Sequence, residues 1–147
     1  MVDFWAALIG AVIGSAATLA AAAIAYKSVV NIERGKAERM AVTELVTAAF
    51  DFDKALLSLQ EAINTKGNAD TDFKLADEHV RVTGRDLNRL SYLVRDDMLA
   101  RLAHGLYQVG FEERVNLIPP APRADLDRVV RQRDALAARA TEVLKGL

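Results

Sequence analysis

The apolar positions of the chain begin with one uninterrupted run, Phe4 to Ala25, in which none of the 22 residues is charged. As a helix this run extends about 33 Å at about 1.5 Å per residue, enough to cross a hydrocarbon core of about 30 Å. Aromatic rings and lysine side chains settle at the two membrane interfaces. The pattern therefore predicts a transmembrane helix over residues 1–27. Its expected interfacial anchors are Trp5, Tyr26 and Lys27.

After this run, apolar residues recur with the three-and-four spacing of helices that pack against other helices. Breaks fall near Gly67, near Asp96, where acidic residues offer N-caps, and at the prolines of 119–122. Residues 28–147 are therefore expected to form a small up-and-down bundle of about four helices that continues the transmembrane helix. The fold class is all-α, with bundle helices at about 28–64, 71–94, 97–116 and 122–146.

The predicted core positions lie on one stripe of each bundle helix. On the first helix they are Leu45, Ala49, Phe52, Leu56, Leu59 and Ile63. On the other three they are Phe73, Ala76, Val80, Thr83, Leu87, Leu90, Val94, Leu99, Leu102, Ala103, Leu106, Val109, Gly110, Leu126, Val129, Val130, Leu136, Ala137, Ala140, Val143, Leu144 and Leu147. Arg133 interrupts the last stripe. Asp51 and Asp53 are two residues apart on the first helix and are expected to face solvent.

The predicted span separates large side chains from small ones. Phe4, Leu8, Val12 and Leu19 fall on one side of the helix, whereas the other side carries a GxxxG motif. Small faces let helix backbones approach closely in lipid, where close packing drives association. We therefore predict that this side packs against another transmembrane helix, either a second copy or another subunit. The alternative is that the ten alanines of the run produce the pattern by chance. The predicted packing residues are Ala6, Gly10, Gly14, Ala17 and Ala21.

The charges that flank the span predict its orientation. Lys27, Arg34, Lys36 and Arg39 follow it, whereas Asp3 and the terminal amine precede it. Cationic flanks stay in the cytoplasm, so we expect a single-pass protein of the inner (plasma) membrane with its N-terminus outside and residues 28–147 in the cytoplasm. A cleaved signal peptide is the alternative. It is disfavoured by the acidic start of the chain and by an apolar core longer than about 15 residues.

The remaining composition argues against most chemistry. The net charge of -1 provides no basic field for nucleic acid, and the absence of cysteine excludes disulfides. His79 follows Glu78 directly and His104 follows Arg101 by three residues, so neither fits the Glu-x-x-His pattern of a di-iron bundle. We find no nucleophile elbow, phosphate loop or dinucleotide motif. The expectation is a protein without enzymatic activity, cofactor, metal or small-molecule substrate.

Two short features suggest recognition. Arg128, Arg131 and Arg139 on the last helix are candidates to contact anionic headgroups or a protein partner, although interleaved acidic residues also fit a solvated face. Pro119, Pro120 and Pro122 match a PxxP motif, which aromatic grooves bind as polyproline II. A rigid connection between two helices is the simpler explanation of these prolines.

These features together predict a non-catalytic accessory or interaction subunit of a membrane assembly. The alternative is a phage or prophage membrane effector, in lysis or exclusion, whose span oligomerises. In layout alone the chain resembles the inner-membrane spanins of phages, which have an N-terminal anchor and a helical body. Spanins carry that body in the periplasm, opposite to the orientation predicted here, and no motif links the chain to them. We therefore assign no family.

Overall fold

A computed structural model describes the backbone of residues 2–65, 69–118 and 124–147, and the side chains of residues 18–65, 71–118 and 124–147. Four helices make up this described part: α1 (Val2–Asn64), α2 (Ala69–Ser91), α3 (Asp97–Leu117) and α4 (Leu126–Gly146). It contains no strand. The all-helical four-helix bundle predicted from the sequence is therefore confirmed.

The chain divides into two compact units, Met1–Ala37 and Glu38–Leu147, whereas the sequence predicts a division after residue 27. Helix α1 is continuous through both units. Among the residues with described side chains, no helix combines the length and the apolarity needed to cross a membrane. Positions 4–17 of the predicted span lie outside that set.

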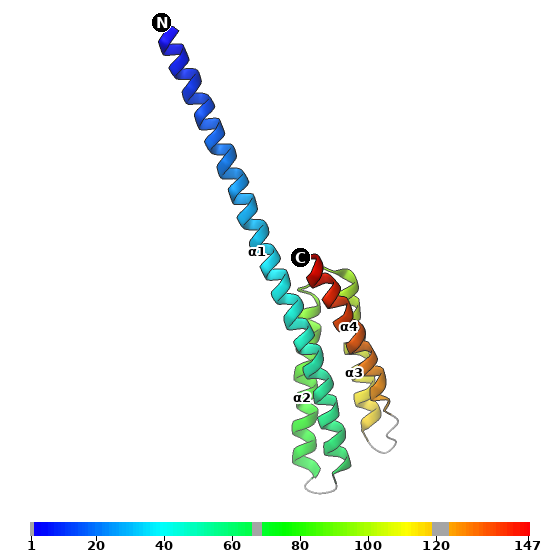
Figure 1. The fold of residues 1–147 in the computed structure, drawn as a ribbon. Helices are drawn as coiled ribbons and strands as arrows, with labels where there is room; N and C mark the ends of the chain where they lie inside the picture. The colour runs from blue at the N-terminus through cyan, green and yellow to red at the C-terminus, as the bar shows by residue number, and fades with distance from the viewer. Residues whose placement is uncertain (1, 66–68, 119–123) are drawn as a thin grey trace. The chain divides into compact units, whose positions relative to one another are not determined.

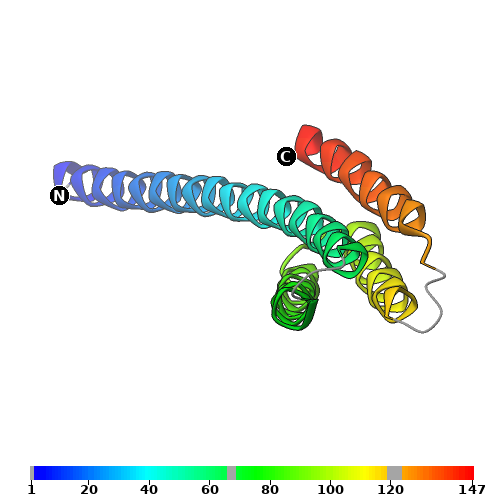
Figure 2. The same ribbon diagram turned by 90° about the horizontal axis from the view of Figure 1, so that it is seen from below.

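Within Glu38–Leu147 the four helices alternate in direction, and α3 packs against both α2 and α4 (Figure 1, Figure 2). The heptad of α1 forms the centre of the core, because Leu45, Phe52, Leu56 and Leu59 are fully buried. The buried positions of the other helices also follow the predicted stripes; they include Val80, Leu87, Leu90, Leu99, Ala103, Leu106, Val129, Leu136 and Ala140. Leu147 is an exception, since 43% of its surface is exposed. Its placement in the core was wrong because it is the C-cap after the end of α4.

Capping sets the helix ends near residue 96. Asp96 is the N-cap of α3, and its Oδ1 accepts a hydrogen bond of 2.8 Å from the backbone N–H of Leu99. Helix α2 ends at Ser91 rather than at the predicted residue 94, and Val94 is buried in the intervening turn. Helix α4 begins at Leu126 rather than at residue 122.

Two glycines let α2 and α3 approach the aromatic side chains at the centre of the bundle. A Cβ atom added to Gly110 would overlap the ring of Phe52, and one added to Gly84 would lie 2.6 Å from Cε2 of Phe111. The rings of Phe52 and Phe111 stack with their centroids 5.9 Å apart. The glycines therefore permit close helix packing, at a cost of about 1 kcal/mol each in helix propensity.

Candidate functional site

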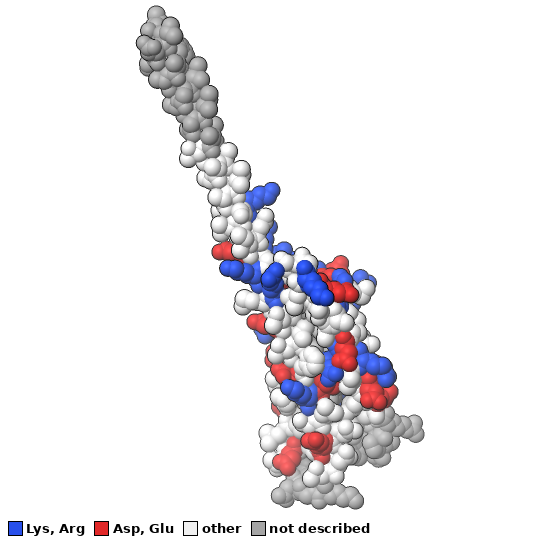
Figure 3. All heavy atoms as spheres, in the orientation of Figure 1, with Lys and Arg blue, Asp and Glu red and all other residues white. Residues whose placement is uncertain are grey.

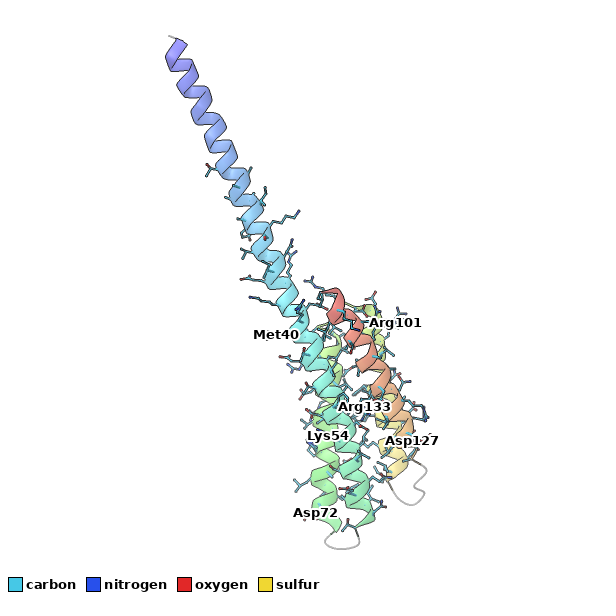
Figure 4. The ribbon with its side chains drawn as sticks, in the orientation of Figure 1. Met40, Lys54, Asp72, Arg101, Asp127 and Arg133 are labelled. Carbon is cyan, nitrogen blue, oxygen red and sulfur yellow. The ribbon has the colours of Figure 1, made fainter. Side chains whose placement is uncertain are left out.

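The described bundle contains buried charges that the sequence did not predict. Asp53 is buried on α1, where its carboxylate pairs with Nη1 of Arg133, a residue of α4 that Figure 4 labels. Arg133 also donates to Asp134 and lies over the ring of Phe50, with 4.7 Å from Cζ to the ring centroid. The hydrogen bond with Asp134, followed by the charge of Asp53, raises the pKa of Arg133. The prediction that Asp53 faces solvent was wrong because α4 covers it.

The position of Arg133 in the apolar stripe of α4 is the signal that could have revealed this pair. A charged residue on a buried face needs an opposite charge across the interface. Asp51, in contrast, is exposed as expected.

Glu113 is a second buried charge, with 1% of its surface exposed. Its Oε2 accepts the backbone N–H of Asp125 at 2.7 Å, and its Oε1 accepts Nη1 of Arg128 at 2.8 Å. Nη2 of Arg128 reaches Glu112 at 3.3 Å. Arg128, a candidate headgroup or partner contact, thus pairs from the first turn of α4 with two carboxylates of α3.

Arg139 joins the end of α4 to the turn between α2 and α3. Its Nη2 lies 2.5 Å from Oδ2 of Asp96, and its Nη1 lies 3.0 Å from Oε2 of Glu142. The hydrogen bond from Arg139, together with that from the Leu99 amide, holds the pKa of Asp96 below its usual value. Arg131 is 67% exposed and lies 3.6 Å from Asp125. Of the three predicted contact arginines, Arg131 is therefore the most exposed.

Further ion pairs connect the other helices. Arg114 on α3 makes two hydrogen bonds to Asp77 on α2, of 2.6 and 2.8 Å. Glu38 on α1 accepts the backbone N–H of Arg95 at 2.9 Å. Within the described residues no buried side-chain nitrogen or oxygen lacks a hydrogen-bond partner. The buried charges of the bundle thus serve its internal structure.

Only part of the predicted packing face lies among the described side chains. Ala21 and Lys27 are exposed, and 74% of the surface of Tyr26 is exposed. The side chains of Trp5, Ala6, Gly10, Gly14 and Ala17 lie outside the described residues, as do Pro119, Pro120 and Pro122. The predictions on all of these positions stay predictions.

Among the grooves on the described surface of the bundle, two are lined by residues of neighbouring helices. One runs between α1 and α2 and is lined by Thr43, Glu44, Thr47, Ala48, Asp51, Thr83, Asp86, Arg89 and Leu90. The other lies between α2 and α3 and is lined by Glu78, Arg81, Arg85, Tyr107 and Phe111. Neither includes a histidine, and His79 and His104 are both exposed. In the described parts of the chain, no three His, Cys, Asp or Glu residues are grouped so as to hold a metal ion.

No protein-family model, curated protein or solved structure matches the chain.

Proposed function

We propose that this protein is a single-pass, membrane-anchored helical subunit that acts without catalysis in a membrane assembly. Residues 4–25 cross the inner membrane with the N-terminus outside, and the bundle lies in the cytoplasm. The protein acts by positioning its partners. The span binds another transmembrane helix, and the bundle binds a cytoplasmic partner through its surface.

The observation that carries the proposal is the arrangement of the uncharged run. A plain anchor needs only apolar bulk, whereas this run has Gly10, Gly14 and alanines on one side and Phe4, Leu8, Val12 and Leu19 on the other. In lipid such a small face favours close packing against a second helix. Helix α1 is continuous from this run to Asn64.

The interior of the bundle is filled and its buried charges are paired, which favours binding of partners at the bundle's surface. The core is filled by aliphatic and aromatic side chains, and its buried carboxylates of Asp53 and Glu113 pair with arginines of α4. The intermixed Lys, Arg, Asp and Glu side chains of the visible face suit a solvated domain that binds other proteins (Figure 3).

Two measurements test the anchor. The full chain should stay with the membrane during alkaline carbonate washing and be released by detergent. A reporter enzyme that works only in the cytoplasm should be active when it is fused after Leu147, whereas one that works only outside the cytoplasm should be inactive there. Release by carbonate refutes the span, and activity only outside the cytoplasm refutes the orientation.

The packing face is tested by Gly10→Ile and Gly14→Ile, with Val12→Ile on the opposite side as the matched control. Isoleucine keeps the run apolar but prevents close backbone approach. Both glycine variants should insert normally and lose the partner that copurifies with the wild-type chain from native membranes, whereas the control keeps it. Unchanged association in both glycine variants refutes the packing face.

The same small face also suits self-association, as expected for a phage or prophage effector of lysis or exclusion. For that function the glycine variants should lose toxicity on expression, and no other subunit should copurify. Toxicity that persists in both variants argues against the effector.

A further inference from the structure

The groove between α2 and α3 combines aromatic rings with arginine side chains, and we call it the aromatic groove. Tyr107 and Phe111 of α3 are partly exposed in it, and Arg81 and Arg85 of α2 border it. Val115, one turn beyond Phe111 on the same side of α3, is 62% exposed. Three apolar side chains on one side of α3 are therefore accessible beside two cations. A group of this kind is typical of an interaction site.

The core of the bundle fixes the rings of the aromatic groove. The ring of Phe111 stacks on the buried ring of Phe52, with 5.9 Å between centroids, and tilts against that of Tyr107 at 4.8 Å. Tyr107 in turn stacks on His104 at 6.2 Å. Gly84 leaves the space that Phe111 occupies, because a Cβ atom there would lie 2.6 Å from its Cε2. Rings that are already fixed lose little conformational freedom when a ligand side chain packs on them.

The two arginines of the aromatic groove share one weak partner. Glu78 lies 3.7 Å from Arg81 and 3.4 Å from Arg85, and all three side chains are more than half exposed. Exposed pairs of this kind contribute little, so a ligand carboxylate can replace Glu78, and one carboxylate cannot balance two guanidinium groups. The bonds from Arg114 to Asp77 are shorter, 2.6 and 2.8 Å, and that pair is closed. The aromatic groove therefore keeps a positive charge that a ligand can reach.

Two neighbouring acidic residues are turned toward other partners. Glu112 reaches Arg128 of α4 at 3.3 Å. Asp86 lies 3.8 Å from Arg89, and both line the groove between α1 and α2. That other groove has three carboxylates and one arginine, which is the opposite balance of charge. Of these two grooves, the aromatic groove is thus the one that attracts an acidic ligand.

We propose that the aromatic groove binds an acidic segment of a partner protein. An aromatic or aliphatic side chain of that segment packs on Tyr107 and Phe111, while its carboxylates pair with Arg81 and Arg85. Arginine suits this role because its guanidinium group can hold a carboxylate through two parallel hydrogen bonds. The inference rests on the proposed function, in which the bundle binds a partner through its surface, and it adds the place and the chemistry of that contact.

The test measures binding of a fluorescein-labelled peptide, in which glutamates flank a single tryptophan, to the full chain in non-ionic detergent by fluorescence anisotropy. Arg85→Gln removes a cation from the aromatic groove. Arg89→Gln is the matched control, because it removes the same charge from the same helix. Both arginine side chains are 70% exposed, and their acidic partners lie at 3.4 and 3.8 Å.

The wild-type chain should bind the peptide saturably. Arg85→Gln should weaken binding several-fold, whereas Arg89→Gln should leave it unchanged. A peptide with glycine in place of tryptophan, and one with glutamines in place of the glutamates, should each bind several-fold more weakly than the original. Circular dichroism should show unchanged helix content in both variants, since both arginines are exposed.

Other outcomes overturn the inference in distinguishable ways. Absence of saturable binding refutes it, and equal weakening by both substitutions shows attraction by overall charge alone. Equal binding of the peptide without tryptophan refutes the contact with the rings. Displacement of the peptide by a single-stranded oligothymidylate that binds more tightly shows a nucleic-acid site instead. Self-association of the wild-type chain that Arg85→Gln abolishes shows a second copy in the groove.

The proposed function fails in a different measurement. Retention of the chain during carbonate washing does not depend on Arg85, so a chain that stays with the membrane but does not bind the peptide refutes the groove and leaves the anchor. A chain that carbonate releases refutes the anchor, and its binding of the peptide is still measured independently.

Discussion

Replacing Gly110 by alanine tests the approach of α3 to the centre of the core. The added Cβ would overlap Cε1 and Cζ of Phe52 and lie 3.3 Å from its Cδ1. Phe52 is fully buried, so its ring has no route to solvent. Overpacking of this kind costs about 1–3 kcal/mol, whereas alanine regains about 1 kcal/mol in helix propensity. Two overlapping ring atoms put the cost at or above the upper limit, so the free energy of unfolding should fall by about 2 kcal/mol.

Gly105→Ala is the matched control on the same helix. Its Cβ would lie 3.7 Å from Oε1 of Gln132, an ordinary contact, so the substitution should stabilise the chain by about 0.4–1 kcal/mol. The two substitutions thus have opposite signs. The assay is urea unfolding of the full chain in mild detergent, followed by far-ultraviolet circular dichroism.

A Gly110→Ala chain that is as stable as the wild type, or stabilised like Gly105→Ala, refutes the close approach. A double-mutant cycle with Phe52→Leu checks the cause. The smaller side chain should relieve the overlap, with a favourable coupling of at least about 1 kcal/mol. Additive effects of the two substitutions place the destabilisation elsewhere.

Two further predictions concern the ion pairs. Arg133→Met leaves the buried Asp53 carboxylate without its cation, so the free energy of unfolding in urea should fall by about 3–5 kcal/mol. Adding Asp53→Leu should recover most of this loss. A small loss in the single variant contradicts the prediction. Arg139 lowers the pKa of folded Asp96, so Asp96 stabilises the fold above its unfolded pKa of about 3.9, and this is lost as pH falls through the lower folded value. The free energies of unfolding of wild type and Asp96→Asn should therefore differ at neutral pH and converge below about pH 4, and a constant difference contradicts the linkage.

The helical fold was predictable because its signals are local. The heptad of α1, the acidic N-cap at Asp96 and the break at the prolines each depend on residues within a few turns of one another. The structure confirms the four-helix bundle, and Leu45, Phe52 and Leu59 are buried as predicted. Helix ends were less accurate, since the turn after Ser91 buries Val94 without keeping it helical.

The candidate surfaces were only partly predictable. The sequence offered Arg128 and Arg139 as candidates to contact headgroups or a partner, and it did not show the carboxylates with which they pair on other elements of the fold.

The sequence by itself determined the uncharged run with its small face, the helical character of the chain and most of the residues that each helix buries. Only the tertiary structure decided that Asp53 lies buried against Arg133, and that Gly110 meets the ring of Phe52. The physical reason is the range of the interactions. Helix periodicity and capping act between neighbours along the chain, whereas charge pairing and close packing depend on which helix faces lie opposite each other.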